Sequence, residues 1–133
     1  MSRIPGYAFN QTRQTFVATK LQVANTHWSR LRGLLGVGPS HFGAGHGLWI
    51  VPCHGVHTLA MRFAIDVIYL DHDCRVVHLA ENVVPWRMTP VLMEAATVLE
   101  VPSRTIWSTG TQVGDVIEIS VGAKPAAEER VSA

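Results

Sequence analysis

Short apolar runs, rich in β-branched residues and ended by Pro, Gly or Asp, constrain the fold most. The clearest are LWIV at 48–51, IDVIYL at 65–70, TVLEV at 97–101 and VIEISV at 116–121. Runs of this length and composition are typical of β-strands. They do not alternate regularly with helical segments, so a doubly wound parallel sheet is not expected. The sequence therefore predicts a mostly β (α+β) fold, a small antiparallel β-barrel or sandwich with one or two short peripheral helices.

A further strand is indicated by TFVATKLQVA at 15–24. Its residues alternate weakly, so that Val17 and Leu21 face one side and Lys20 and Gln22 face the other. Such alternation is typical of a half-buried strand, with one face on a core and one face more polar.

Turn and helix signals complete the pattern. Asp-His-Asp at 71–73 predicts a tight turn that returns the chain into a strand at 75–84. Apolar residues recur at helical spacing over 25–35, which favours a short amphipathic helix. A single helical turn is expected over 103–110, because the segment ends in glycine.

The chain of 133 residues has the length of one domain. Residues 1–14 predict an N-terminal arm, which at most adds one short edge strand. Residues 15–121 predict a single barrel-like domain, and the small and charged residues 122–133 predict a flexible C-terminal tail. A chain of this size needs no disulfide, metal or other cofactor merely to fold.

Composition excludes several classes of partner. The net charge is +1, so no strong field argues for nucleic acid or an anionic membrane surface. No apolar run approaches the roughly 20 residues of a membrane helix, and the N-terminus has no apolar stretch typical of a signal peptide. We therefore expect a cytoplasmic protein with no nucleic-acid or membrane partner, and the oligomeric state is not predicted.

Chemistry-bearing side chains concentrate in the central segment at 47–71, where Cys53 and His57 are four residues apart. This spacing puts both on one face of a strand and also on one face of a helix. Three interpretations stay open: a buried cysteine beside a hydrogen-bonded histidine, a Cys–His nucleophilic pair, or half of a site for zinc or another transition metal. Further ligands of such a metal would be sought among His46, His54, Asp66 and His78.

Aromatic and charged residues beside this segment predict a pocket near residues 53–66. Trp49 or Trp86 would form its wall, and Arg62 would bind an anionic ligand or pair with Asp66. Asp66 itself would either cap backbone N–H groups or line the pocket. The five glycines of residues 36–47 indicate a loop, which could close over the pocket.

Three stretches carry a family resemblance: Arg-Gly-Leu-Leu at 32–35, CHGVHTLAMRFAIDVIYLD at 53–71 and VLEVPSRTIWSTGTQVGDVIEI at 98–119. On these residues the chain, over roughly 15–121, resembles an uncharacterised bacterial and archaeal family known as domain-of-unknown-function family 192. It is similar to the subgroup that has Cys and His-Thr before the Ile-Asp pair. The chain departs from the family at Ala64, where many members have proline, and at Cys74, where the hairpin turn usually has glycine.

The resemblance implies a small, mostly β, barrel-like domain with a covering helix, and it implies no activity. No functional residue is carried over from it. The sequence therefore favours binding over catalysis: a module for a small molecule or a protein partner, with its pocket near residues 53–66. The alternatives are a metal-dependent or thiol enzyme centred on Cys53 and His57, and a structural or assembly protein.

Overall fold

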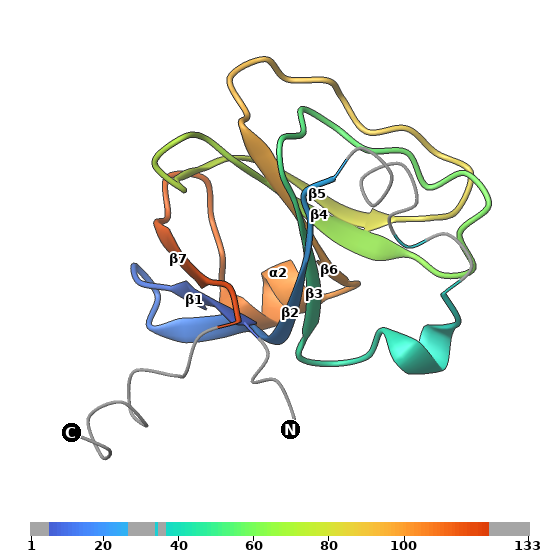
Figure 1. Cartoon of the computed structure of the whole chain (residues 1–133), viewed down its shortest axis with the longest axis horizontal. Coiled ribbons are helices and arrows are strands. Elements are labelled where there is room, and N and C mark those ends of the chain that lie inside the picture. Colours follow the sequence, from blue (N-terminus) through green and yellow to red (C-terminus); the bar gives the residue numbers. More distant parts are fainter. Residues whose placement is uncertain (1–5, 27–33, 35–36, 123–133) are drawn as a thin grey trace.

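The computed structural model describes residues 6–26, 34 and 37–122. Its strands are β1 (Gly6–Asn10), β2 (Thr15–Ala24), β3 (His46–Ile50), β4 (Ile65–Leu70), β5 (Val76–Val83), β6 (Thr97–Pro102) and β7 (Ile117–Ser120). A 3-10 turn, η1 (Pro39–His41), precedes β3, and a short helix, α2 (Thr105–Thr109), follows β6. The mostly β fold that the sequence predicts is thus confirmed, as Figure 1 shows.

All seven strands belong to one sheet in the order β5-β4-β6-β3-β2-β1-β7. Neighbouring strands are antiparallel except β2 and β3, which run parallel. The sheet curls so far that its two edges touch at one end, where Arg75 and Val116 form a β-bridge. There Val76 N–H donates to the Asp115 carbonyl at 2.8 Å, and Ile117 N–H donates to the Cys74 carbonyl at 2.9 Å. The result is a half-barrel (Figure 1).

Both faces of the sheet are buried. The inner core lies inside the curl, and it includes Leu21, Leu99, Val101 and Ile117, with Ile106 of α2 packed into it. The outer core lies on the opposite face, beneath the long connections, and includes Leu48, Ile50, Ile65 and Val98 with Phe42 and Met61. Every residue of β4 is buried for this reason. Continuous apolar runs follow from this arrangement, because no face of such a strand meets water.

Most of the predicted elements appear at the predicted residues. The strands expected at 15–24, 65–70 and 97–101 are β2, β4 and β6, and the helical turn is α2, which ends at Gly110 with φ 68°. The helix predicted over 25–35 falls largely outside the described residues. Residues assigned to an arm form β1, which pairs with β2 and β7 and so is not an edge strand. No helix within the described ranges is long and apolar enough to span a membrane.

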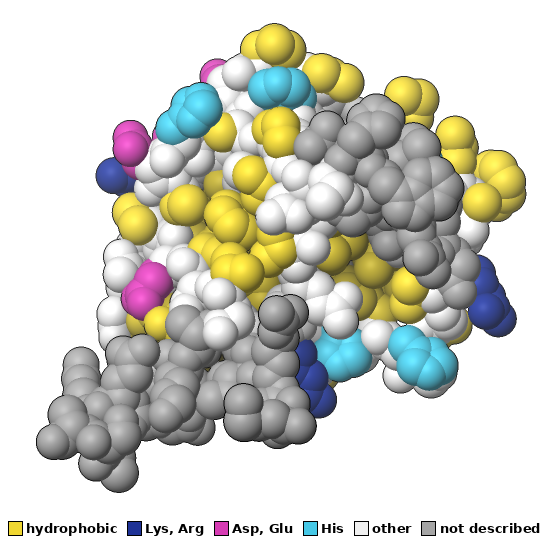
Figure 2. Space-filling view, viewed as in Figure 1, with side chains coloured by type: hydrophobic (Ala, Val, Ile, Leu, Met, Phe, Trp, Pro, Cys, Tyr) yellow, Lys and Arg dark blue, Asp and Glu magenta, His cyan; other side chains and the backbone are white. Residues whose placement is uncertain are grey.

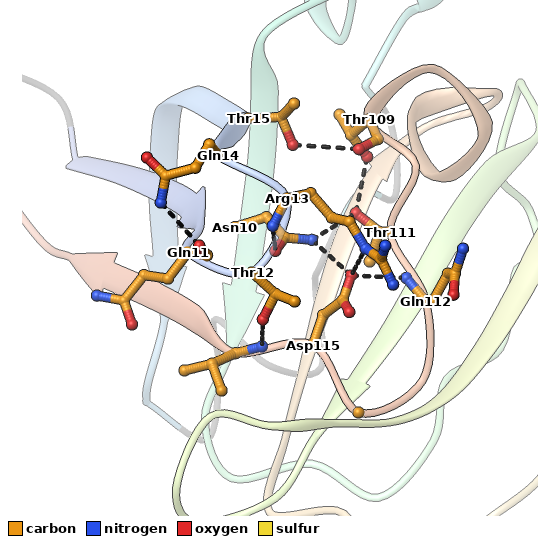
Figure 3. Close-up of polar contacts among 12 residues, drawn as sticks. Asn10, Gln11, Thr12, Arg13, Gln14, Thr15, Thr109, Thr111, Gln112 and Asp115 are labelled. Carbon is orange, nitrogen blue, oxygen red and sulfur yellow. Dashed lines mark hydrogen bonds and ion pairs between the residues drawn. The ribbon is translucent and has the colours of Figure 1, made fainter.

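An ion pair between exposed Arg13 and buried Asp115 joins the β1–β2 turn to the loop before β7 (Figure 3). Arg13 Nε and Asn10 Nδ2 both donate to Asp115 Oδ2 at 3.0 Å, and Gln112 N–H donates to the same oxygen at 2.9 Å. Burial by itself would raise the pKa of Asp115, but these hydrogen bonds outweigh it and hold that pKa below its ordinary value. This carboxylate therefore ties the β1–β2 turn to the loop before β7 through three hydrogen bonds to one oxygen.

Candidate functional site

The segment that follows β3 forms neither a strand nor a helix between residues 53 and 64. It is held instead by backbone hydrogen bonds to the connection at 84–96. Thr58 N–H donates to the Arg87 carbonyl at 2.8 Å, and Leu92 N–H donates to the His54 carbonyl at 2.9 Å. These two long connections together cover the outer core.

Cys53 and His57 have different surroundings within this segment. Cys53 is half-buried against the outer core, and its Sγ donates to the Gly55 carbonyl at 3.1 Å. His57 is exposed, and its backbone pairs with Met88. Among the described residues, no group of three or more His, Cys, Asp or Glu side chains is placed to hold a metal ion. The Cys–His pair stays a prediction.

Asp66 is fully buried and takes a structural position. Its Oδ1 accepts a hydrogen bond from Asn82 N–H at 2.8 Å, and its Oδ2 accepts one from Ile106 N–H at 2.9 Å. The carboxylate thus ties β5 and the first turn of α2 to β4. Arg62 is exposed. The ion pair found among the described side chains joins Arg13 to Asp115, so Arg62 forms no ion pair with Asp66.

The two tryptophans predicted to form a pocket wall differ in their exposure to solvent. Trp49 is half-buried beside the inner core and donates from Nε1 to Thr97 Oγ1 at 3.0 Å. Trp86 is 63% exposed, on the connection that also exposes Met88, Val91 and Met93. Neither tryptophan lines either of the two hollows described below.

The larger hollow, of about 560 Å³, lies between the outer face of the sheet and the glycine-rich connection before β3. Its polar lining consists of Lys20, Gln22, His41 and His46. Its apolar lining consists of Leu34, Val37, Phe42 and Leu48, with Gly47 beside them. A volume of this size suits a small organic ligand. We call this hollow the β2–β3 cavity.

Strand register explains why these side chains meet. In the parallel pair, Lys20 lies opposite His46 and Gln22 lies opposite Leu48, so all four share the outer face. The chain before β3 folds back over them, and His46 Nδ1 contacts the His41 carbonyl at 2.9 Å. Because a carbonyl oxygen only accepts, Nδ1 carries the hydrogen, and Nε2 is the ring nitrogen left for a ligand. Figure 2 shows histidine side chains beside a basic side chain at the lower edge, near the place of η1 in Figure 1.

Glu100 extends the same row of side chains by one strand. It lies opposite Leu48 on β3 and opposite Val67 on β4, so it shares the outer face with them. Its residue surface is only 4% exposed, and its Oε2 has no hydrogen-bond partner among the described residues. Burial raises the pKa of Glu100 to about 8. Unlike Asp66 and Asp115, this carboxyl lacks compensating partners.

A second hollow of about 320 Å³ lies near the start of β4, with Asp66, Asn82 and Ser103 in its lining. Arg104 stacks over the Trp107 ring at 5.2 Å from its centroid at the rim. Its buried carboxylate, Asp66, is already satisfied by two backbone N–H groups. This hollow therefore contains no buried oxygen without a hydrogen-bond partner, among the described residues, like the one at Glu100.

The sequence interpretation missed Glu100, Lys20 and Gln22 as site residues. A signal for Glu100 was present, because it interrupts an apolar run at a position whose neighbours are buried on both faces. His46 and His54, two of the metal ligands considered from the sequence, are separated in the structure. His41 and His46 line the cavity, whereas His54 contacts the Ala95 carbonyl at 2.7 Å.

One curled, seven-stranded sheet with two covered faces defines a small, mostly β domain. The chain belongs to the family DUF192, described as "Uncharacterized ACR", whose model matches residues 8–119. This confirms the family resemblance drawn from the three sequence stretches.

Solved structures share the fold. A protein of unknown function from Novosphingobium aromaticivorans has a TM-score of 0.72 at 20% identity, covering 87% of this chain and 84% of its own. A putative transcription regulator from Sinorhizobium meliloti has a TM-score of 0.72 at 18% identity, covering 90% of this chain and 97% of its own. Identities this low support the fold alone. A comparison with curated proteins found no match.

Proposed function

We propose that this protein is a small-molecule-binding domain that holds its ligand in the β2–β3 cavity. The observation that carries the proposal is the buried carboxyl of Glu100, which has an unpartnered oxygen and lies in the same row as the cavity residues Leu48 and Gln22. A buried polar group without a partner costs about 1–3 kcal/mol. Sites that break a local packing rule in this way are often functional.

The lining supports the same proposal. Ligand sites in proteins combine a mainly apolar wall with a few polar groups that fix orientation. The cavity has this composition, with Phe42 and Leu48 as buried walls and Lys20 and His46 as polar groups. The pocket predicted near residues 53–66 differs from it in position, because the lining residues of the cavity lie between 20 and 48.

A fluorescent probe with an aromatic body, 8-anilino-1-naphthalenesulfonate, tests the proposal. We expect native protein to enhance and blue-shift its fluorescence. Gln22→Trp should remove most of this signal, because an indole on β2 fills the cavity while suiting a strand. Gln112→Trp, at an exposed turn position, is the matched control and should keep the signal.

The exposed apolar connection at 84–93 is the competing location for the probe. A Met93→Gln variant removes one of its most exposed apolar side chains, which is 77% exposed. Signal that survives Gln22→Trp but disappears in Met93→Gln would place the probe on that surface and overturn the proposal. Circular dichroism of each variant confirms that the fold is intact.

A further inference from the structure

The lining of the β2–β3 cavity is polar at its entrance and apolar in its deeper part. The side chains of Leu34, Phe42 and Leu48 are buried, and they form the deep part of the lining. Lys20 and His41 are exposed and lie at the entrance. A ligand that fits this gradient has an apolar body and a polar head that stays close to water.

The entrance carries the positive charge of Lys20 and no carboxylate among the described lining residues. Lys20 and His46 lie opposite each other on the parallel pair β2–β3, and His41 is held near His46 by the contact with its carbonyl. No carboxylate belongs to the described lining, and Lys20 forms no ion pair with the residues that the structure describes. Glu100, the nearest acid in the strand register, stays protonated near neutral pH because burial raises its pKa to about 8. An anionic head therefore meets attraction without an opposing negative charge.

We infer that the cavity takes an organic carboxylate with an apolar tail, its head held by Lys20 beside His46 and its tail lying against Phe42 and Leu48. The inference rests on the proposed function and names the class of ligand for the same site. Lys20 supplies a point charge for the head, and His46 lies directly opposite it on the parallel pair. The apolar walls supply affinity in proportion to tail length.

Isothermal titration with four probes tests the class: octanoate, hexanoate, octylamine and 1-octanol, all at pH 7 and low ionic strength. Octanoate should bind more tightly than octylamine and 1-octanol, which share its tail length but carry a positive charge or none. Hexanoate should bind about tenfold or more weakly than octanoate, since each methylene contributes roughly fourfold. Raising the salt concentration should weaken the binding of octanoate.

Variants assign the head to its residues. Lys20→Gln should weaken octanoate binding roughly twofold to fivefold, and it should leave 1-octanol unchanged, because one exposed charge contact is lost. Lys20→Arg keeps the charge and should restore most of the affinity. Arg87→Gln removes an exposed charge on the connection at 84–96, outside the cavity lining, and should change nothing.

The possible outcomes separate the chemical class of the ligand from the location of its binding site. Octylamine or 1-octanol binding as tightly as octanoate, with all binding abolished by Gln22→Trp, would overturn the carboxylate class and keep the cavity as a binding site. Octanoate binding that survives Gln22→Trp would overturn the assignment to this cavity. Failure of every probe, the fluorescent sulfonate included, would overturn the carboxylate inference together with the proposed function.

Discussion

Replacing Glu100 by glutamine should flatten the pH dependence of stability. Glutamine has nearly the shape of glutamic acid and cannot ionise, so the variant keeps the packing and removes the titration. In the folded protein Glu100 is 4% exposed and its pKa is raised from 4.5 to about 8. In the unfolded chain the carboxyl meets water and titrates near its ordinary value. The folded state therefore holds a proton that the unfolded state releases between these two pH values.

The sign and size of the effect follow from this difference. Below pH 4.5 both states carry the proton, and the contribution of Glu100 to stability is fully present. As the pH rises toward 8, the free energy of unfolding falls by about 1.4 kcal/mol per pH unit, and above 8 it levels off. Between pH 5 and pH 8 the loss is roughly 3–4 kcal/mol. That is a large share of the roughly 5–15 kcal/mol that holds a typical domain folded.

Urea unfolding followed by tryptophan fluorescence at pH 5, 6, 7 and 8 measures this directly. The quantity to plot is the free energy of unfolding of the wild type minus that of Glu100→Gln, because other titrating groups cancel in the difference. We expect it to fall steadily across this range. Glu81→Gln, at an exposed position of β5, is the matched control, and its difference should stay flat. A flat difference for Glu100→Gln as well would refute the reasoning, because Glu100 would then titrate as if solvated.

Two further substitutions test structural parts of the argument. Asp66→Ala leaves the buried Ile106 N–H and the part-buried Asn82 N–H without their acceptor and should lower the free energy of unfolding by about 2–3 kcal/mol in urea titrations; a change within about 0.5 kcal/mol would contradict its role as an anchor. Cys74 has a φ of 58°, a left-handed conformation that favours glycine, so Cys74→Gly should raise stability by about 0.5–1 kcal/mol and raise the melting temperature. Cys74→Ala keeps a Cβ in the same conformation, and an equal gain in that variant would show that strain is not the cause.

The strands could be predicted because their signals are local. The runs at 65–70 and 97–101 are short, β-branched and bounded by turn residues, and they became β4 and β6. By contrast, β1 was not predicted as an inner strand. Residues 6–10 show no decisive pattern of their own. Their inner position depends on pairing with β7, whose residues lie more than 100 positions away in the sequence.

The candidate cavity could not be predicted in the same way, because its lining residues are not adjacent in the sequence. Cys53 and His57 are close along the chain, but the even spacing has meaning only in a regular strand or helix, and the segment is neither. The β2–β3 cavity instead joins Lys20 to His46, which are far apart in sequence and meet through a parallel pair. Two parallel neighbouring strands are joined by a long connection, so no short sequence motif predicts their pairing.

Glu100 shows what a single sequence does contain about function in this fold. An acidic residue inside a strand that is apolar on both faces cannot be explained by solvent exposure, and it lacks the partners that satisfy Asp66 and Asp115. It weakens the fold as the pH rises toward 8, in a domain that could have placed an apolar side chain there. A ligand that donates to its free oxygen, or accepts from its proton, would recover part of that loss on binding. The stability measurement tests this cost at Glu100 itself, whereas the titration with octanoate tests the neighbouring cavity, whose described lining does not include Glu100.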